Sequence, residues 1–427
     1  MGRDMAEAVV SGGKEVLTTH DGQPLKVSLA RALRREKIRA LLLIAPLLIF
    51  ILISFILPIA DMLFRSVENK IVSDTLPKTV VALNAWDPAS NEAPGEDVFA
   101  ALHDDLAIAV KERSHTKLGS RLNYDQPGIS SLFRKTGRRV ARMEEGNYKQ
   151  QFLDVDPDWG KVENWTTIKR LSPTITDSYF LASVDAERGA EGIQRKADNE
   201  RIYILLFART IFLSMVITFS CILLGYPIAY LLANLPVRTS NLLMILVLLP
   251  FWTSLLVRTS AWKVLLQQQG VINDVLVWIG LIDEAGRLVM INNMTGTIIA
   301  MTHILLPFMI LPLFSVMKTI SPSYVRAGKS MGATDWTTFW KIYFPNTIPG
   351  IGAGSILVFI LAIGYYITPE LVGGTSGVFI SNRIAYHISS SLNWGLAAAL
   401  GTILLVLVLA LYWVYDRIVG IDNVKLG

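Results

Sequence analysis

The residues that could do catalytic or metal chemistry are few in this sequence. Its single cysteine, Cys221, cannot form an internal disulfide, and no Cys/His cluster has metal-ligand spacing. The triplet Gly328-Lys329-Ser330 resembles the end of a phosphate-binding loop, but Ser323 stands where that loop requires a glycine. His303 and His387 each stand alone, as structural hydrogen-bonding histidines do. We therefore expect no enzyme, no metal and no cofactor.

The composition indicates a membrane protein. Of 427 residues, 52% are hydrophobic and 18% charged, with a mean hydropathy of +0.43, against roughly 25% charged in a soluble domain. The net charge of +5 comes without a dense basic patch, so we expect no nucleic-acid partner. Six uncharged stretches approach the ~20 residues that cross a bilayer. We predict an all-α membrane protein with six transmembrane helices at 40–60, 210–237, 239–257, 288–317, 342–369 and 384–415.

Basic residues in the short loops predict the orientation, because the cytoplasmic side accumulates Lys and Arg. They place both termini inside and the large charged segment 65–201 outside, where we expect it to fold with exposed polar helices at 111–121 and 134–149. The predicted organisation is a cytoplasmic tail at 1–39, a first helix at 40–64, an extracytoplasmic insert at 65–201, a five-helix core at 202–420 and a tail at 421–427.

The loop between the fourth and fifth stretches, 318–347, is the most informative segment. Ser321 and Pro322 signal a helix start, and Gly332 a helix end. A second turn, 336–343, is expected to expose Phe339, Trp340 and Tyr343 before Pro345 breaks it. A short helix, a glycine turn and an aromatic knob suit the groove of another protein. The alternative is an ordinary helix lying on the membrane surface.

This loop resembles the coupling loop of the binding-protein-dependent ABC transporter permeases. Six residues fall on the family's pattern, and three depart from it: Arg326 replaces a glutamate, Gly328 an alanine and Phe344 a leucine. The resemblance implies the type I ABC importer permease fold. It also implies that the loop couples to an ATPase through Arg326, Ala327, Gly328, Gly332, Ala333, Trp336, Phe339, Ile342 and Pro345.

Three further segments, 249–262, 270–274 and 364–374, resemble the spermidine/putrescine permeases of the PotB type. The insert is larger than that type leads us to expect. The resemblance implies a non-catalytic permease subunit in the bacterial inner (plasma) membrane, surrounded by membrane lipid. Its expected partners are two cytoplasmic ATPase subunits, a second permease subunit that forms a heterodimer with it, and an extracytoplasmic substrate-binding protein.

The resemblance further implies a substrate pathway lined by polar and aromatic groups. Carboxylates and aromatic faces attract the ammonium groups of a polyamine, whereas Arg258 favours the alternative of an anionic, opine-like or amino-acid-derived solute. Tyr and Trp could equally form an interfacial belt, and Glu370 could pair with Arg258 or lie among lipid headgroups. A third alternative is a membrane-anchored receptor. The pathway candidates are Trp252, Arg258, Tyr365, Tyr366, Glu370 and Trp394.

Overall fold

The computed structural model describes residues 8–11, 14–17, 25–189 and 192–419. The chain divides into two units, Met1–Phe64 and Arg65–Gly427, and each is described by itself. In the first, strands β1 (Ala8–Ser11) and β2 (Lys14–Leu17) pair antiparallel. Helix α1 (Leu25–Ile51) begins within the segment 1–39 that was predicted as a tail. The predicted C-terminal tail, 421–427, lies outside the described residues.

The first unit also carries the first apolar helix. Helix α1 continues through a π-turn, η1 (Leu52–Ile56), into α2 (Leu57–Arg65). The stretch Leu33–Arg65 is long and apolar enough to cross a membrane, and none of its most apolar window is buried inside the described structure. A helix that is apolar on all sides is suited to contact lipid or other helices.

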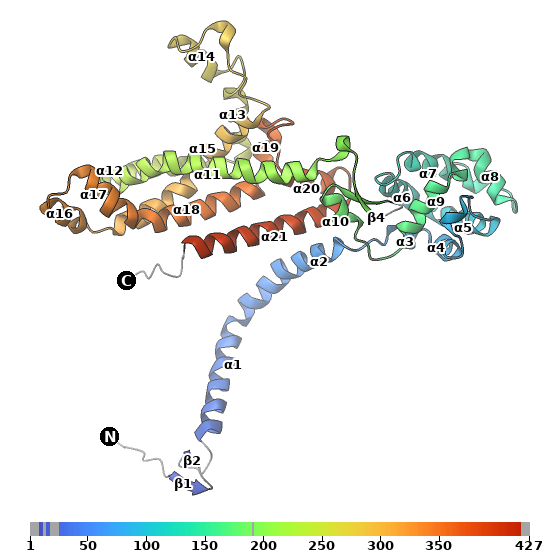
Figure 1. Ribbon diagram of the computed structural model, residues 1–427, viewed down its shortest axis with the longest axis horizontal. Coiled ribbons are helices and arrows are strands. Elements are labelled where there is room, and N and C mark those ends of the chain that lie inside the picture. The colour runs from blue at the N-terminus through green and yellow to red at the C-terminus, as the bar shows by residue number, and fades with distance from the viewer. Residues whose placement is uncertain (1–7, 12–13, 18–24, 190–191, 420–427) are drawn as a thin grey trace. The chain divides into compact units, whose positions relative to one another are not determined.

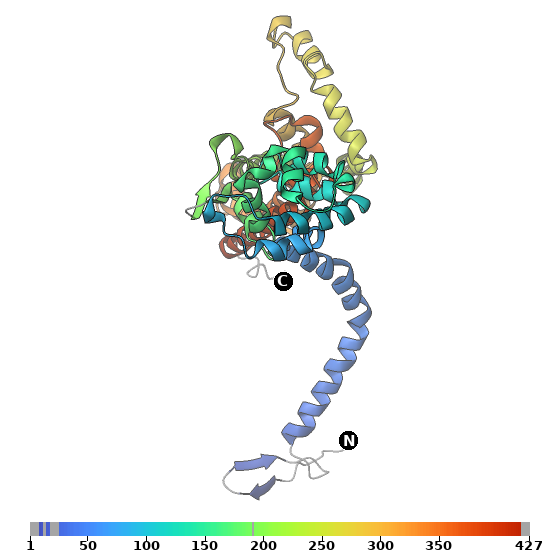
Figure 2. The same cartoon turned by 90° about the vertical axis from the view of Figure 1, so that its right-hand side faces the viewer.

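The second unit supplies the remaining candidate spans, whose arrangement Figures 1 and 2 show. Four are single helices in the described residues: α11 (Tyr203–Asn234), α15 (Met294–Thr319), α18 (Phe344–Gly364) and α21 (Trp394–Val419). A further pair consists of α12 (Val237–Leu248) with η6 (Leu249–Trp252), followed by α13 (Leu255–Leu265) after a bend of 95°. Counted as one span, this pair completes the six predicted helices.

Several predicted span boundaries were wrong. The fourth span begins at Met294, not at 288, because the Asn293 side chain accepts a hydrogen bond from Gly296 N at 3.1 Å and caps the helix. The fifth ends at Gly364, not at 369, and is followed by α19 (Ile367–Val372). The sixth begins at Trp394, because residues 380–389 form a separate helix, α20 (Ile380–Ser389).

Helices α11, α15 and α18 pack around a common apolar core. Leu213, Ile217, Met309 and Leu313 belong to it and are fully buried. Small residues let the helices approach: a Cβ built on Gly354 would lie 2.7 Å from the Met309 sulfur. Short helices lie between these spans. Helix α14 (Val271–Trp278) and η7 (Glu284–Gly286) precede α15, and the loop helices described below precede α18.

Segment 65–201 is largely helical and has its own core. The rings of Phe99 and Trp165 lie 4.8 Å apart, and those of Phe133 and Trp159 lie 5.4 Å apart. All four side chains are fully buried. Its elements are α3 (Ile71–Thr75), α4 (Pro77–Leu83), η2 (Pro88–Ser90), α5 (Glu96–Lys111), α6 (Ser114–Leu122), α7 (Ile129–Gly137), η3 (Val140–Arg142), α8 (Tyr148–Val155), η4 (Pro157–Gly160), α9 (Val162–Arg170), α10 (Ser178–Ser183), strands β3 (Ala186–Gly189) and β4 (Gly192–Arg195), and η5 (Asp198–Glu200).

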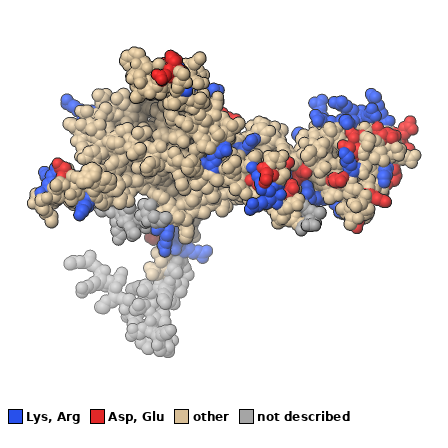
Figure 3. Space-filling view, turned by 45° about the horizontal axis from the view of Figure 1, so that its top comes forward, with Lys and Arg blue, Asp and Glu red and all other residues tan. Residues whose placement is uncertain are grey.

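Two contacts join this segment to the helices that follow. Tyr179 and Phe180 of α10 pack with Leu396 and Leu400 of α21. The buried carboxylate of Asp185 accepts hydrogen bonds from the backbone N–H groups of 202, 203 and 204, at 3.1, 3.0 and 2.8 Å, at the start of α11. In Figure 3 the charged side chains gather over this segment and at the opposite end of the unit, with a broad uncharged surface between.

Candidate functional site

The loop before α18 folds as two short helices joined by a glycine turn. Helix α16 (Pro322–Ser330) is capped by the Ser321 side chain, and Gly332 follows it with φ +86°. The next helix, α17 (Asp335–Thr338), is capped by Thr334, whose hydroxyl accepts from Thr337 N at 3.3 Å. The predicted helix start and glycine end are both confirmed.

The two parts of this loop are fitted closely against each other at Gly328. A Cβ added to this residue would lie 2.5 Å from the Ile342 Cδ1 atom. In this chain the Cδ1 atom of Ile342 occupies the space that the methyl group of an alanine would need. Gly328 therefore lets α16 lie close to the turn that carries Ile342.

The exposed aromatic residues of the loop are not the predicted set. Phe339 and Tyr343 pack against Tyr230 of α11, with ring centres at 5.9 and 5.2 Å. Tyr343 is buried and Phe339 half-buried, whereas the side chains of Trp336 and Trp340 are 72% and 45% exposed. The prediction that Phe339 and Tyr343 are exposed was wrong, because both pack against Tyr230 in the C-terminal half of α11.

Pro345 does not break the helix as predicted. Residues Phe339–Tyr343 form a π-turn, η8, that runs directly into α18, and Pro345 lies in the first turn of α18. Asp335–Gly364 therefore forms one continuous helical stretch of 30 residues. The surface of the loop also presents Arg326 and Ala327, both exposed, and a salt bridge between Lys329 and Asp335.

On the opposite side of the unit, three of the predicted pathway residues lie together. Glu370 is exposed on α19, and one of its carboxylate oxygens accepts a hydrogen bond from Asn382 Nδ2 at 2.6 Å. The same amide nitrogen donates to the backbone oxygen of Tyr366 at 2.8 Å, and the Ser381 hydroxyl donates to that of Tyr365 at 2.6 Å. Helix α20 thus holds the break after α18 and fixes the orientation of the carboxylate.

Arg258 lies on α13 and donates a hydrogen bond to the backbone of the bend that precedes this helix. Its Nη2 donates to the backbone oxygen of Thr253 at 3.0 Å. Its Nε is buried and has no hydrogen-bond partner in the described part of the chain. Helix α13 is held to α19 by a hydrogen bond between Thr259 and Thr368 at 3.1 Å. No ion pair joins Arg258 to Glu370 among residues 25–189 and 192–419, so the predicted alternative pairing of these two groups is not found.

Two predicted pathway residues lie elsewhere. Trp252 ends η6 at the bend before α13, and its side chain is 85% exposed. Trp394 lines a separate cavity together with Arg121 and Tyr179 of segment 65–201. The structure therefore brings together Tyr365, Tyr366 and Glu370.

The two histidines make structural hydrogen bonds, as the sequence suggested. His303 Nδ1 accepts from the Trp262 indole nitrogen at 3.0 Å and so joins α15 to α13. His387 lies between the Tyr203 hydroxyl at 2.9 Å and the Ser391 hydroxyl at 2.8 Å. His387 lies on α20, outside the spanning helices, and burial lowers its pKa to about 4. It therefore stays neutral at physiological pH.

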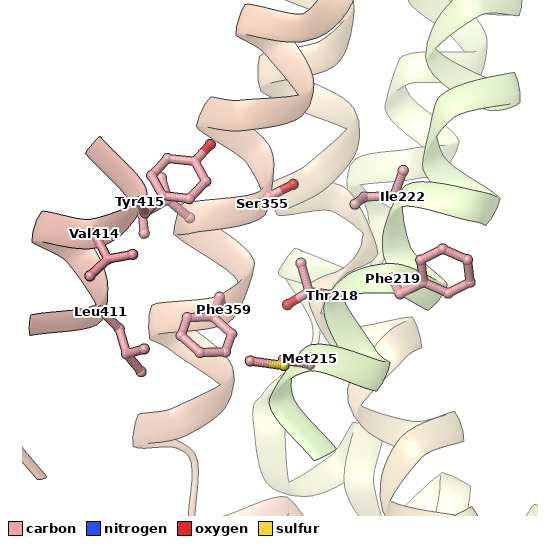
Figure 4. Close-up of a pocket in the computed structure, with 10 residues that line it drawn as sticks. Met215, Thr218, Phe219, Ile222, Ser355, Phe359, Leu411, Val414 and Tyr415 are labelled. Carbon is pink, nitrogen blue, oxygen red and sulfur yellow. The ribbon is translucent and has the colours of Figure 1, made fainter. Parts of the chain in front are cut away.

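A groove between α11, α18 and α21 has a different character (Figure 4). It has a volume of about 360 Å³, and its described lining holds no charged side chain. Figure 4 shows the apolar side chains Met215 and Phe359 facing the groove, with the hydroxyl-bearing residues Ser355 and Tyr415 at its upper end. A surface of this kind suits lipid chains or another apolar helix rather than a charged solute.

Asn382 is a residue of the Glu370 cluster that sequence reasoning missed. It bonds to Glu370, to the backbone oxygen of Tyr366 and, through its Oδ1, to Phe379 N at 2.9 Å. A signal was available, because an asparagine in the first turn of a helix can cap that helix. The predicted sixth span, 384–415, placed this short helix partly inside a longer one and obscured that signal.

Comparison with known proteins places residues 202–419, just over half of the chain, in the family described as binding-protein-dependent transport system inner membrane component. The PotB spermidine/putrescine permease of Salmonella typhimurium is 34% identical over 222 residues, 51% of this chain and 77% of that protein. The inner membrane ABC transporter permease YdcU of Escherichia coli strain K12 is 31% identical over 251 residues, 56% of this chain and 79% of that protein.

A solved structure of a bacterial alginate ABC transporter with its alginate-bound periplasmic protein is similar at 19% identity. Its TM-score is 0.43, and the match covers 53% of this chain and 81% of that one. The family match covers α11 through α21, and with them both the coupling-loop candidate and the Glu370 cluster. This chain belongs to the inner-membrane permease components of binding-protein-dependent transport systems.

Proposed function

We propose that this permease takes up polyamines or closely related organic cations. The observation that carries the proposal is the exposed Glu370 carboxylate at the break after α18, which accepts a hydrogen bond from Asn382, while the same amide nitrogen donates to the backbone oxygen of Tyr366. A fixed carboxylate can stabilise an ammonium group as it leaves water, and aromatic faces such as those of Tyr365 and Tyr366 attract the same group. The similarity to the PotB spermidine/putrescine permeases, at 34% identity, supports the same class of solute.

The proposed arrangement has both termini on the cytoplasmic side and segment 65–201 outside. The chain acts as a non-catalytic subunit beside a second permease, and two separate ATPase subunits bind the loop 318–347. A binding protein delivers the solute from the other side. ATP-driven movement of the loop shifts the helices between inward-open and outward-open states, which is a population shift driven by differential contacts.

The solute is tested by ATPase stimulation of the reconstituted complex with its own binding protein. We expect spermidine or putrescine to stimulate ATP hydrolysis, and Glu370→Gln to reduce that stimulation about tenfold, the equivalent of one lost charge-assisted contact of ~1.4 kcal/mol. Asp283→Asn is the matched control, because Asp283 is another exposed carboxylate, outside the Glu370 cluster. Stimulation by neutral or anionic solutes alone would exclude the polyamine assignment.

The coupling role is tested at the two exposed tryptophans of the loop. We expect Trp336→Ala and Trp340→Ala together to abolish co-purification of the ATPase subunits, because both rings are available to fill a groove. Trp278→Ala on α14 is the control, since Trp278 is more exposed than either tryptophan and lies on another helix. Retention of the ATPase subunits by the double variant would remove the loop from the proposed interface.

A second candidate solute is an anion, and one observation favours it. Arg258 keeps a buried Nε without a hydrogen-bond partner in the described residues. A carboxylate-bearing solute could satisfy that donor as a charge-assisted hydrogen bond. In the same ATPase assay, an anionic or opine-like solute would then stimulate ATP hydrolysis. The Arg258→Gln variant would lose this stimulation, and the Glu370→Gln variant would keep it.

A further inference from the structure

A cavity of about 540 Å³ lies between segment 65–201 and the turn that leads from α20 into α21. Its walls come from the start of α3, from α6, from Tyr179 of α10 and from residues 390–395. The two sides are closely fitted, because a Cβ added to Gly395 would overlap the Tyr179 ring. A volume of this size is typical of small-molecule sites. The cavity does not include the Glu370 cluster.

The charged residues in the lining of this cavity are mostly cations. Among the described residues its lining holds one carboxylate, Glu68, which pairs with Lys70. Arg121 is buried in the wall, where it bonds to Asp125 at 2.5 Å and to the Tyr179 hydroxyl. Lys117 is exposed at the cavity, and no carboxylate lies within 4.0 Å of its ammonium in the part of the chain that the structure describes. Including Arg65, four cations face or support this space.

Hydroxyl groups and one aromatic face complete the lining. Thr116, Ser120, Tyr124 and Ser390 present hydroxyls that can donate to or accept from a ligand. Trp394 supplies a flat apolar surface at the first residue of α21. A phosphate group needs positive charge, and a polyol needs hydrogen-bond partners. A lining that combines cationic side chains with hydroxyl-bearing side chains therefore suits a phosphate attached to a polyol better than it suits a bare ion.

We propose that this cavity binds a glycerol-phosphate type of anion and thereby joins segment 65–201 to the start of α21. In the orientation proposed above, the cavity opens on the extracytoplasmic side. The ligand has two possible sources of the same chemistry: a free polyol phosphate and the phosphoglycerol headgroup of a lipid, since Trp394 begins a spanning helix where headgroups lie. The site is independent of the transported solute, so it stands even where the polyamine assignment fails.

The test is equilibrium dialysis of the purified full-length chain with radiolabelled glycerol 3-phosphate. We expect saturable binding that unlabelled glycerol does not compete, and a Kd about tenfold weaker in Lys117→Gln. Lys117→Arg should keep the affinity, and Lys111→Gln, an exposed lysine at the end of α5 outside the cavity, should bind like the wild type. Absence of saturable binding, equal Kd values in Lys117→Gln and Lys111→Gln, or competition by glycerol would overturn the proposal.

A lipid comparison identifies the source. The same chain is placed in nanodiscs of phosphatidylcholine with or without phosphatidylglycerol, and binding of the labelled probe is repeated. Loss of probe binding only with phosphatidylglycerol assigns the cavity to a lipid headgroup. Unchanged probe binding in both nanodiscs assigns it to a free polyol phosphate. Both results support the anion site.

Discussion

Asp185 should control the stability of the first turn of α11. Its carboxylate is 2% exposed and accepts from three consecutive backbone N–H groups, those of 202, 203 and 204. These groups have no acceptor within the helix, and loss of a side-chain cap costs about 0.5–2 kcal/mol. Asp185 also has φ +54°, a conformation that costs a residue with a Cβ about 1–2 kcal/mol unless it is Asn or Asp.

A substitution series separates these two contributions. Asp185→Asn keeps an acceptor and tolerates the backbone, so we expect a loss of about 1 kcal/mol. Asp185→Gly loses the cap but fits the backbone and should cost about 2 kcal/mol, and Asp185→Ala about 3 kcal/mol. With tenfold per 1.4 kcal/mol, amide exchange of 202–204 should accelerate about 5-fold, 30-fold and 100-fold in that order.

The assay is hydrogen–deuterium exchange with mass spectrometry on the detergent-solubilised chain. Asp198→Asn is the matched control, because Asp198 is highly exposed and pairs only with its neighbour Arg201 in the described structure. Its exchange at 202–204 should equal that of the wild type. Equal exchange in Asp185→Ala and Asp198→Asn would refute the capping argument. Faster exchange in Asp185→Gly than in Asp185→Ala would refute the backbone argument.

Three further predictions concern other parts of the second unit. Gly328→Ala should lower the melting temperature by only a few degrees, because the flexible end of Ile342 can move away from the added methyl group. A Gly328→Leu variant with the melting temperature of the wild type would show that the close contact between residue 328 and Ile342 does not matter for stability. The hydrogen bond from Lys135 lowers the pKa of Asp156, so this ion pair should stabilise segment 65–201 above the ordinary carboxyl value of 3.8 and cease to do so as the pH falls through the lower folded-state pKa. Thermal melts from pH 6 to pH 2 should therefore show a smaller acid-induced loss in an Asp156→Asn variant, and an unchanged loss would contradict the assignment. Cys221 is fully buried, so a membrane-permeant maleimide should label it only after denaturation in detergent, as a mass shift would report; rapid labelling of the folded chain would contradict the packing of α11.

The sequence predicted the spanning helices well, because a run of about 20 residues without charged side chains is long and apolar enough to cross a bilayer. It also predicted where the first short helix of the loop 318–347 begins and ends, since Ser321 and Gly332 mark helix ends through local chemistry. The polar helix predicted at 111–121 is present as α6, 114–122, but Arg121 is buried against Tyr179, 58 residues away, and is not exposed as predicted. Such a contact depends on tertiary packing, which a local pattern of charges does not contain.

The same limit applies to the solute pathway. Tyr365, Tyr366 and Glu370 are near neighbours in the chain, and all three accept hydrogen bonds from α20. Trp394 was grouped with them by residue type, yet it lies at the cavity beside segment 65–201. That segment lies wholly outside the residues matched to the family, so a comparison with the family pattern could not reveal which of its residues face Trp394.

The π-turn at Phe339–Tyr343 has a consequence for how this loop can change during evolution. A π-turn accommodates one residue more than the corresponding α-helical turn, and each α-helical residue rotates the chain by about 100°. Deleting a single residue here would restore a regular helix and turn Trp336 about 100° relative to α18. One insertion or deletion would therefore turn the exposed Trp336 toward a different direction while leaving the packing of α18 intact.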